Sequence, residues 1–299
     1  MTEQHWTVTG PQTIEVDEVT TVHAHLVDGR LDVVAHEDPV TRVEVHSVDG
    51  RPVEVTFRDG HLVVGHEPNT SGGLAGFLRK WTDFGGNARA DIHIAVPARV
   101  DTKIGTVRAE ALVSGTEGEA KVSTASGSLL VSRTRGPLTL TNVSGDATVR
   151  DHEGPITSTT VSGDVVLSGA VEHLTSSTVS GDVTMDLTTQ PDWIKTNSVS
   201  GDLLVRVPDE AVVEVHASAI SGRVTVGGMQ VSGRGGAVVR SARPERTHLR
   251  VSTVSGDVTV LGTSQHVSDD GPGPAGHPGV HGVRGAGASG AAPGVSWIA

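Results

Sequence analysis

Five aspartates share one position in a recurring phrase, Val-Ser-Gly-Asp, and their type and spacing could support chemistry. They are Asp146, Asp164, Asp182, Asp202 and Asp257. If the phrases stack in register, neighbouring carboxylates of the first four lie about 5 Å apart in an outward column. Such a column could bind Ca²⁺, as repeats of Gly- and Asp-rich β-rolls do. Weaker copies place Ser128 and Arg223 at this position, which breaks the column. The alternative, which we favour, is that these side chains stabilise turns through hydrogen bonds to local backbone.

No other group of residues suggests a catalytic or ligand-binding centre. The 15 histidines are scattered, and His23 and His25, which share a strand face, lack a third partner nearby in sequence. The chain has no cysteine, which excludes thiol catalysis and Cys-ligated metals. Its net charge is 23 minus 35, or -12, so it lacks the basic footprint that nucleic acids require. We expect a protein that is not an enzyme and has no cofactor, metal or nucleic-acid partner.

The phrase belongs to an internal repeat, which decides the fold class. Its copies centre on Gly127, Gly145, Gly163, Gly181, Gly201, Gly222 and Gly256. Subtracting successive numbers gives intervals of 18, 18, 18, 20, 21 and 34 residues, and the last interval suggests two coils near 17. Positions two before, two after and four after each glycine are small or aliphatic, and the intervening residues are Ser, Thr, Asp or Arg. This alternation is typical of β-strands and predicts that the even positions face inward.

A repeat of this length can close one turn of a stack in which each coil hydrogen-bonds to the next. We therefore predict an all-β fold, a parallel β-solenoid of roughly 18–21-residue coils. A narrow interior filled by Val and Leu also explains why the chain has few aromatic rings, 4 Trp and 3 Phe in 299 residues. Rings are the large burial units of most domains, and this interior has no room for many of them.

The chain also resembles a known family. The segment Ala90–Pro97, the following segment Ala98–Gly105 and the Ser-Gly-Asp coils are similar to a bacterial β-strand-repeat family of unknown function, whose members are labelled adhesin or toastrack-like. The resemblance covers roughly residues 10 to 262. It implies a stack of β-coils and, in some members, a membrane-associated or envelope setting. An unknown protein or envelope partner is what the resemblance implies for this chain.

Four regions are expected along the chain. Residues 1–67 form an N-terminal β region that caps the first coil, and residues 90–263 form the solenoid. Residues 264–299 form a disordered Gly/Pro/Ala tail, because their composition cannot offset the entropy of ordering. An insert, residues 68–89, lies between the N-terminal β region and the solenoid and departs from the β pattern.

The insert is predicted to contain a short amphipathic helix within residues 72–86. Its apolar residues are Leu74, Phe77, Leu78, Trp81 and Phe84, of which the first four follow helical spacing. The helix could cap the open end of the stack, or it could dock on a partner or a membrane surface through these side chains. Deleting residues 72–86 distinguishes the two roles. Removal of a cap would lower thermal stability, whereas removal of a docking helix would leave the melting curve unchanged and abolish partner binding.

The sequence has no secretory signal pattern and no apolar stretch long enough for a membrane span, so we expect a cytoplasmic location. The family resemblance adds the possibility of a surface or envelope association. The functional hypothesis is a non-catalytic interaction or scaffold module that presents a Ser/Thr/Asp-rich face to a partner. The alternatives are a self-associating structural protein that stacks end to end, and a cell-surface adhesin.

Overall fold

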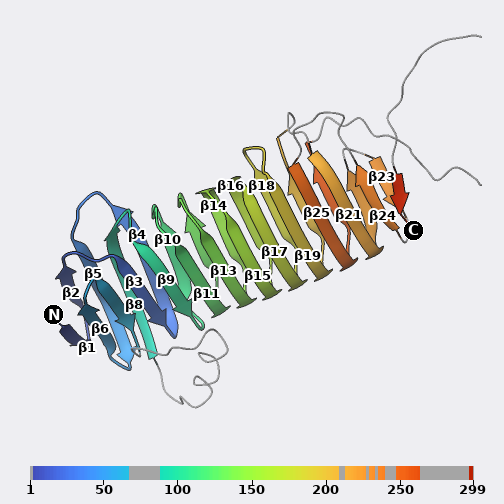
Figure 1. Cartoon of the computed structure of the whole chain (residues 1–299). Coiled ribbons are helices and arrows are strands. Elements are labelled where there is room, and N and C mark those ends of the chain that lie inside the picture. The colour runs from blue at the N-terminus through green and yellow to red at the C-terminus, as the bar shows by residue number, and fades with distance from the viewer. Residues whose placement is uncertain are drawn as a thin grey trace, which may run out of the picture.

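The computed structural model describes residues 3–66, 88–208, 213–226, 229–232, 235–239, 247–262 and 296–298. Over these residues the chain forms two long sheets, one of 14 strands and one of 13, which face each other along the whole stack (Figure 1). We call them sheet A and sheet B. Each regular coil contributes one strand to each sheet, so the prediction of an all-β parallel β-solenoid is confirmed, with two sheets per coil.

Sheet A follows this spatial order: β1 (Gln4–Val8), β6 (Val53–Arg58), β7 (His61–Gly65), β3 (Thr21–Leu26), β9 (Asp101–Thr106), β11 (Ala120–Ser126), β13 (Leu138–Ser144), β15 (Ile156–Ser162), β17 (His173–Ser180), β19 (Trp193–Ser200), β25 (Thr247–Ser255), β21 (Val213–Ser221), β24 (Gly235–Val239) and β27 (Ser296–Ile298). Sheet B follows this order: β2 (Gln12–Val16), β5 (Thr41–Gly50), β8 (Ala88–Pro97), β4 (Asp28–His36), β10 (Glu110–Ser114), β12 (Leu129–Ser132), β14 (Ala147–Glu153), β16 (Val165–Ala170), β18 (Val183–Leu187), β20 (Leu203–Arg206), β26 (Val258–Leu261), β22 (Arg223–Val226) and β23 (Met229–Ser232).

The glycine of each repeat makes the tight corner where the chain passes from sheet A to sheet B. Gly145 has a φ of 126°, a conformation that residues with a side chain rarely adopt. A Cβ atom added to Gly145 would also lie 2.2 Å from the carbonyl oxygen of Gly127, one coil away. The corners therefore stack backbone on backbone, and only glycine fits.

The core lies between the sheets and consists of columns of identical or similar side chains. Leu138 pairs with Ile156, Ile156 with Leu174 and Leu174 with Ile194, and all four are buried. A second buried column is polar, and its members are Thr124, Asn142, Thr160, Thr178, Ser198 and Thr253. Several hydroxyls in it donate to backbone carbonyls of their own corner; Ser198, for example, donates to the Ser200 oxygen at 3.3 Å. This column fixes the entry into the corner.

The predicted inward parity is wrong on the sheet A side of the glycine. Residues two after and four after it, such as Val183 and Met185, are buried as expected, but the valine two before it is half exposed, 49% for Val179. The buried position is three before the glycine, where Thr178 lies. Five positions separate that inward residue from the next, Val183, so strict alternation cannot continue through the corner.

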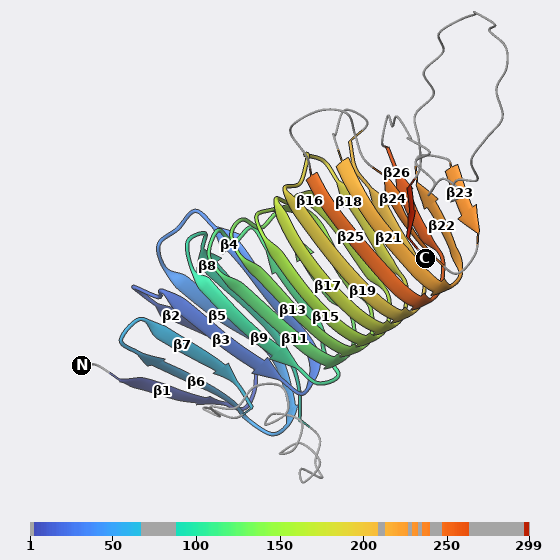
Figure 2. The same ribbon diagram turned by 45° about the vertical axis from the view of Figure 1, so that its right-hand side comes forward.

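The coils do not stack in the order of the sequence at either end. The coil of β25 and β26 lies between the coil of β19 and β20 and the coil of β21 and β22, with parallel pairing on both sides (Figure 2). The prediction that the interval of 34 residues holds two consecutive coils is therefore wrong. Instead β23 and β24 turn back and pair antiparallel with β22 and β21. At the other end, the coil of β3 and β4 lies between β7 and β8 on one side and β9 and β10 on the other.

Antiparallel strands lie at both ends of the stack. At the N-terminal end β1 pairs with β6, β6 with β7, and β2 with β5. At the other end β27, three residues of the predicted tail, pairs antiparallel with β24. The rest of the predicted tail lies outside the described residues. So does the predicted helix of residues 72–86.

Three histidines, of which His66 and His152 are buried and His25 is partly buried, should make stability depend on pH. Burial lowers the pKa of His25 to about 4 and that of His66 to about 4, and it also lowers the pKa of His152. The unfolded chain takes up protons at His25 and His66 near pH 6.5, whereas the folded chain resists them until about pH 4. The free energy of unfolding should therefore fall as the pH drops from 6.5 to 4, by on the order of 1–3 kcal/mol for each of these two histidines, and His152 should act in the same direction.

Urea midpoints measured between pH 7.5 and pH 4.5 test this expectation. The variant His66→Gln removes one of the proton-binding groups, so its stability should change less across that range than that of the unmodified protein. If the urea midpoint depended on pH equally in the two proteins, that result would contradict the lowered pKa of His66.

Candidate interaction surface

The aspartates of the repeat form an unbroken hydrogen-bonded ladder along the outer edge of the corner. The backbone N–H of Asp182 donates to Oδ1 of Asp164 at 2.9 Å, and that of Asp202 donates to Oδ1 of Asp182 at 2.8 Å. The same bond joins Asp164 to Asp146 and Asp257 to Asp202. The predicted break at Arg223 does not exist, because the coil order places Arg223 after Asp257.

Arg223 instead closes the ladder at its end. Its backbone N–H donates to Oδ1 of Asp257 at 2.8 Å, and its guanidinium lies 3.3 Å from Oδ2 of the same carboxylate. At the other end, Ser128 takes the place of the aspartate one coil before Asp146, and the N–H of the following Leu129 donates to the carbonyl oxygen of Asp146 at 2.9 Å. The aspartate column thus runs from a neutral residue to a cation.

The ladder joins successive coils by an acceptor that each coil offers to the next. Within the described part of the chain, no group of three or more His, Cys, Asp or Glu residues is placed to hold a metal ion. Because one carboxylate oxygen of each aspartate is already used by a neighbouring backbone N–H, the geometry supports a structural role for the column.

Asp182→Ala should weaken the stack modestly. It leaves the Asp202 N–H without its acceptor, which typically costs about 0.5–1.5 kcal/mol. Asp182→Asn keeps an acceptor oxygen at the same place and should recover most of the loss. Thermal melts of the three proteins, each with and without added Ca²⁺, provide the measurement. A melting temperature raised by Ca²⁺ only when Asp182 is present would instead show that the column binds the metal.

Next to this corner, the outer face of sheet A carries an exposed line of aliphatic side chains, one per coil. We call it the valine stripe. In spatial order its members are Val143, Val161, Val179, Val199, Val254 and Ile220. The exposed fractions are 47% for Val161 and 50% for Val199, and Ile220 reaches 63%. Single exposed valines are ordinary, but a continuous line of them across six coils is an apolar surface.

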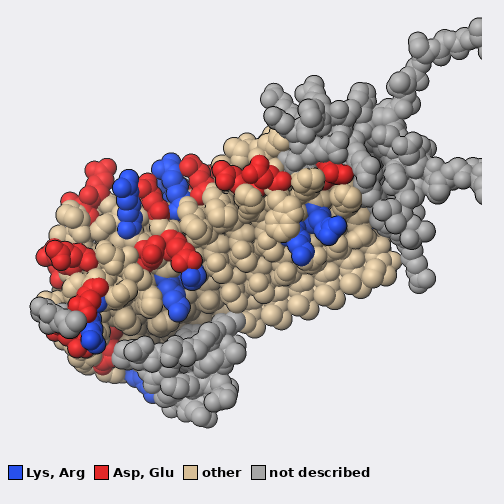
Figure 3. All heavy atoms as spheres, viewed as in Figure 1, with Lys and Arg blue, Asp and Glu red and all other residues tan. Residues whose placement is uncertain are grey.

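Two columns of small polar side chains flank the valine stripe. On the strand side they are Thr141, Thr159, Ser177, Asn197, Ser252 and Ser218, and on the corner side they are Ser144, Ser162, Ser180, Ser200, Ser255 and Ser221. We call these the hydroxyl columns. Over β13, β15 and β17 the face of sheet A shows no Lys, Arg, Asp or Glu, whereas charged side chains line one edge and basic side chains appear on the face itself further toward the C-terminal end (Figure 3). There β19 and β25 carry Lys195 and Arg250 at outward positions beyond the strand-side column. The face is therefore uncharged over β13, β15 and β17.

The five predicted contact residues, Leu74, Phe77, Leu78, Trp81 and Phe84, lie outside the described residues, so the structure neither joins them to this surface nor separates them from it. The strands that precede and follow their segment, β7 and β8, belong to sheets A and B respectively.

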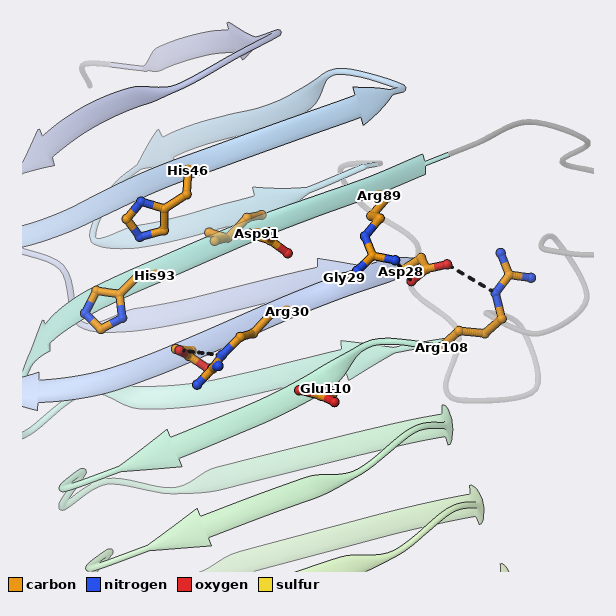
Figure 4. Close-up of a pocket in the computed structure, with 11 residues that line it drawn as sticks. Asp28, Gly29, Arg30, His46, Arg89, Asp91, His93, Arg108 and Glu110 are labelled. Atoms are coloured by element: carbon orange, nitrogen blue, oxygen red, sulfur yellow. Dashed lines mark hydrogen bonds and ion pairs between the residues drawn. The ribbon is translucent and has the colours of Figure 1, made fainter.

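A second feature, which sequence reasoning missed, is a charged groove of about 630 Å³ on sheet B near the N-terminal end (Figure 4). Arg89 and Arg108 each lie 3.8 Å from the carboxylate of Asp28, which stands between them. In the adjacent row Arg30 lies between Asp91 and Glu110 by strand register, and it pairs with Asp32 at 2.9 Å. The groove alternates charges that largely satisfy one another.

This alternation has a physical use where the coils are out of sequence order. Opposite charges directly across neighbouring strands stabilise one pairing and penalise its rivals. Here they match β4 to β8 on one side and to β10 on the other. The members are distant in sequence, so only the strand order brings them together. In the sequence these charged residues appear isolated from one another, so nothing in it indicated a groove.

The fold and its surface define the chain as a two-sheet β-solenoid with a glycine corner. Residues 162–261 match the model of the toastrack family, described as Toastrack DUF4097. This match confirms the resemblance to the toastrack-like family over the later coils of the stack, including the interleaved one. No curated protein matches the chain. Among the residues that the structure describes, no helix is long and apolar enough to cross a membrane.

Several solved structures from bacteria are similar to this chain in fold. One is a candidate cell adhesion protein from Clostridium sporogenes, with 13% identity, a TM-score of 0.27, and coverage of 84% of this chain and 99% of that one. A candidate lipid binding protein from Parabacteroides distasonis has 12% identity, a TM-score of 0.41, and coverage of 84% and 97%. A candidate adhesin from Bacteroides fragilis has 13% identity, a TM-score of 0.39, and coverage of 86% and 97%.

Proposed function

We propose that the protein is a non-catalytic interaction module that binds a macromolecular partner through the uncharged face of sheet A. The observation that carries this proposal is the valine stripe with its two hydroxyl columns. A solvated face of a β-sheet normally carries charged or long polar side chains, whereas this one has five exposed aliphatic residues in line with the partly exposed Val143. The adhesin-like labels of proteins with a similar fold agree with an interaction role.

Rigidity supports the same proposal. The strands under the stripe are paired on both sides, in parallel except between β21 and β24, and they cover a core that continues through the stack. A partner that binds this face meets side chains already in place, so little ordering entropy opposes binding. In this proposal the hydroxyl columns of sheet A supply the Ser/Thr part of the partner-binding face, and the aspartate ladder borders it at the corner.

Site-specific photocrosslinking in cells would test the proposal. A photoreactive residue at Thr159 samples the proposed face, and one at Thr148 of β14 samples the outer face of sheet B. We expect defined adducts from position 159 and few from position 148. Equal yields from both positions, or none from either, would contradict a binding role for sheet A.

A further inference from the structure

We propose that the partner of the valine stripe is a second copy of this chain, and that the two copies pack face to face as a parallel two-fold dimer. This inference rests on the proposed function, because it names the occupant of the same surface. Three properties of the described residues support it: the spacing of the stripe, the charge of its surroundings, and the position of the aspartate ladder.

The spacing of the stripe matches only another stack of the same kind. Neighbouring strands of a sheet lie about 4.8 Å apart, so the six aliphatic side chains recur at that interval. An extended peptide laid along the stripe would present side chains on one face about every 6.7 Å, and a helix about every 5.4 Å per turn. Either would lose register within a few coils. A second copy has the required interval throughout, and its aliphatic side chains can interdigitate as in a dry interface between paired sheets.

The surrounding charge explains why contact between copies would occur at this face. Two molecules of net charge -12 repel each other unless they meet where charge is absent. On β13, β15 and β17 the stripe consists of Val, and its strand-side column consists of Thr and Ser. On sheet B the comparable exposed residue Val166 lies beside Arg150, Asp186 and Arg206, in a groove of about 270 Å³. On sheet A the basic residues nearest the stripe, Lys195 of β19 and Arg250 of β25, lie beyond the strand-side column, whereas on sheet B charged residues line the same groove as the exposed valine.

The aspartate ladder decides between the two orientations that a two-fold axis allows. In the antiparallel dimer the ladder of one copy runs beside the ladder of the other, so that like charges meet along several coils. In the parallel dimer each ladder runs beside the strand-side hydroxyl column of the partner copy. There the carboxylate oxygen that the backbone leaves unused can accept hydrogen bonds from Thr159 or Ser177. The parallel arrangement removes the repulsion and is the one we propose.

The size of the contact predicts a weak dimer. Six coils of stripe and flanking columns occupy roughly 30 Å by 15 Å, which is about 900 Å² of buried surface for the pair. Stable interfaces bury about 1,200–2,000 Å², so association should appear at tens to hundreds of micromolar. Light scattering over that range should show the average mass of the full chain rising above 30.8 kDa toward twice that value.

The triple variant Val161→Thr, Val179→Thr and Val199→Thr should stay at the monomer mass over the same range. It keeps the β-branched shape and removes the apolar surface. Val166→Thr, on sheet B, is the matched control and should behave as the unmodified protein does. A monomer at every concentration for the unmodified protein, or dimerisation that survives the triple substitution, would overturn the inference.

The absence of cysteine allows a sharper test of orientation. In the parallel dimer each residue of the stripe faces its own counterpart, so Val161→Cys, Val179→Cys and Val199→Cys should each form disulfide-linked dimers under mild oxidation. We expect rates at least tenfold above that of Val166→Cys, whose parent side chain is 40% exposed. Crosslinking of Val179→Cys with Val199→Cys but not with itself would overturn the parallel arrangement, and rates equal to the control would overturn the dimer.

The two proposals fail in different ways. If the unmodified protein is a monomer but position 159 still forms adducts with another protein in cells, the binding surface stands and the second copy is excluded. If position 159 forms no adducts at all, the proposed function fails as well.

Discussion

Gly163→Ala should destabilise the protein by about 3–5 kcal/mol, one of the largest effects available from adding a single methyl group. Gly163 has a φ of 111°, and a Cβ atom there would lie 2.0 Å from the carbonyl oxygen of Gly145 and 2.7 Å from its carbonyl carbon. Both neighbours are backbone, so no flexible side chain can move away. The corner would have to open, and the hydrogen bonds between these two coils would be strained together.

Gly10→Ala is the matched control, because nothing lies within 4 Å of a Cβ atom added there. It should change the free energy of unfolding by less than about 1 kcal/mol. Urea denaturation of both variants gives the comparison. Equal midpoints for the two variants would show that the corner is not as tightly stacked as the structure has it.

Leu174→Ala should have the second large effect, a loss of about 2–5 kcal/mol. Leu174 is fully buried between Ile156 and Ile194, and removing three carbon atoms from the middle of a continuous column leaves a cavity that rigid neighbouring coils cannot close. Val179→Ala, five residues later on the same strand, is the control. Its side chain is 49% exposed, so the loss should stay near 1 kcal/mol or below.

The same pair of variants tests which side of β17 faces the core. The alternation of apolar residues in the sequence predicted that Val179 points inward, and the structure places it outward. A larger loss for Val179→Ala than for Leu174→Ala would restore the parity predicted from the sequence and would remove the valine stripe from the surface.

The regular part of the fold could be predicted because each of its coils repeats the same local solution. Gly145, Gly163 and Gly181 mark corners at a constant interval, and the residues after them alternate as strands do. The outward direction of Val179 could not be predicted. The number of residues in the corner decides which residues before the glycine face inward, and the sequence does not show that number directly.

The coil order at the two ends was equally hidden. The phrase around Gly256 resembles that around Gly222, so local pattern gives either coil as the neighbour of β19. What distinguishes them is long-range: Arg223 pairs with Asp257 and ends the aspartate ladder, and the charges of Asp28, Arg89 and Arg108 match strands far apart in the chain. The candidate surface was missed for the same reason, because it follows from a parity and an order that only the assembled stack defines.

The interleaved ends also restrict how such a protein can change its length. A coil inserted at either end would have to displace one that is held between two neighbours from other parts of the chain. In the middle, from β9 to β20, order in space equals order along the chain, so a duplicated or deleted unit of 18 residues shifts everything beyond it without altering any pairing at the ends. The length of the stack can therefore change in steps of about 4.8 Å while the two end pieces stay the same.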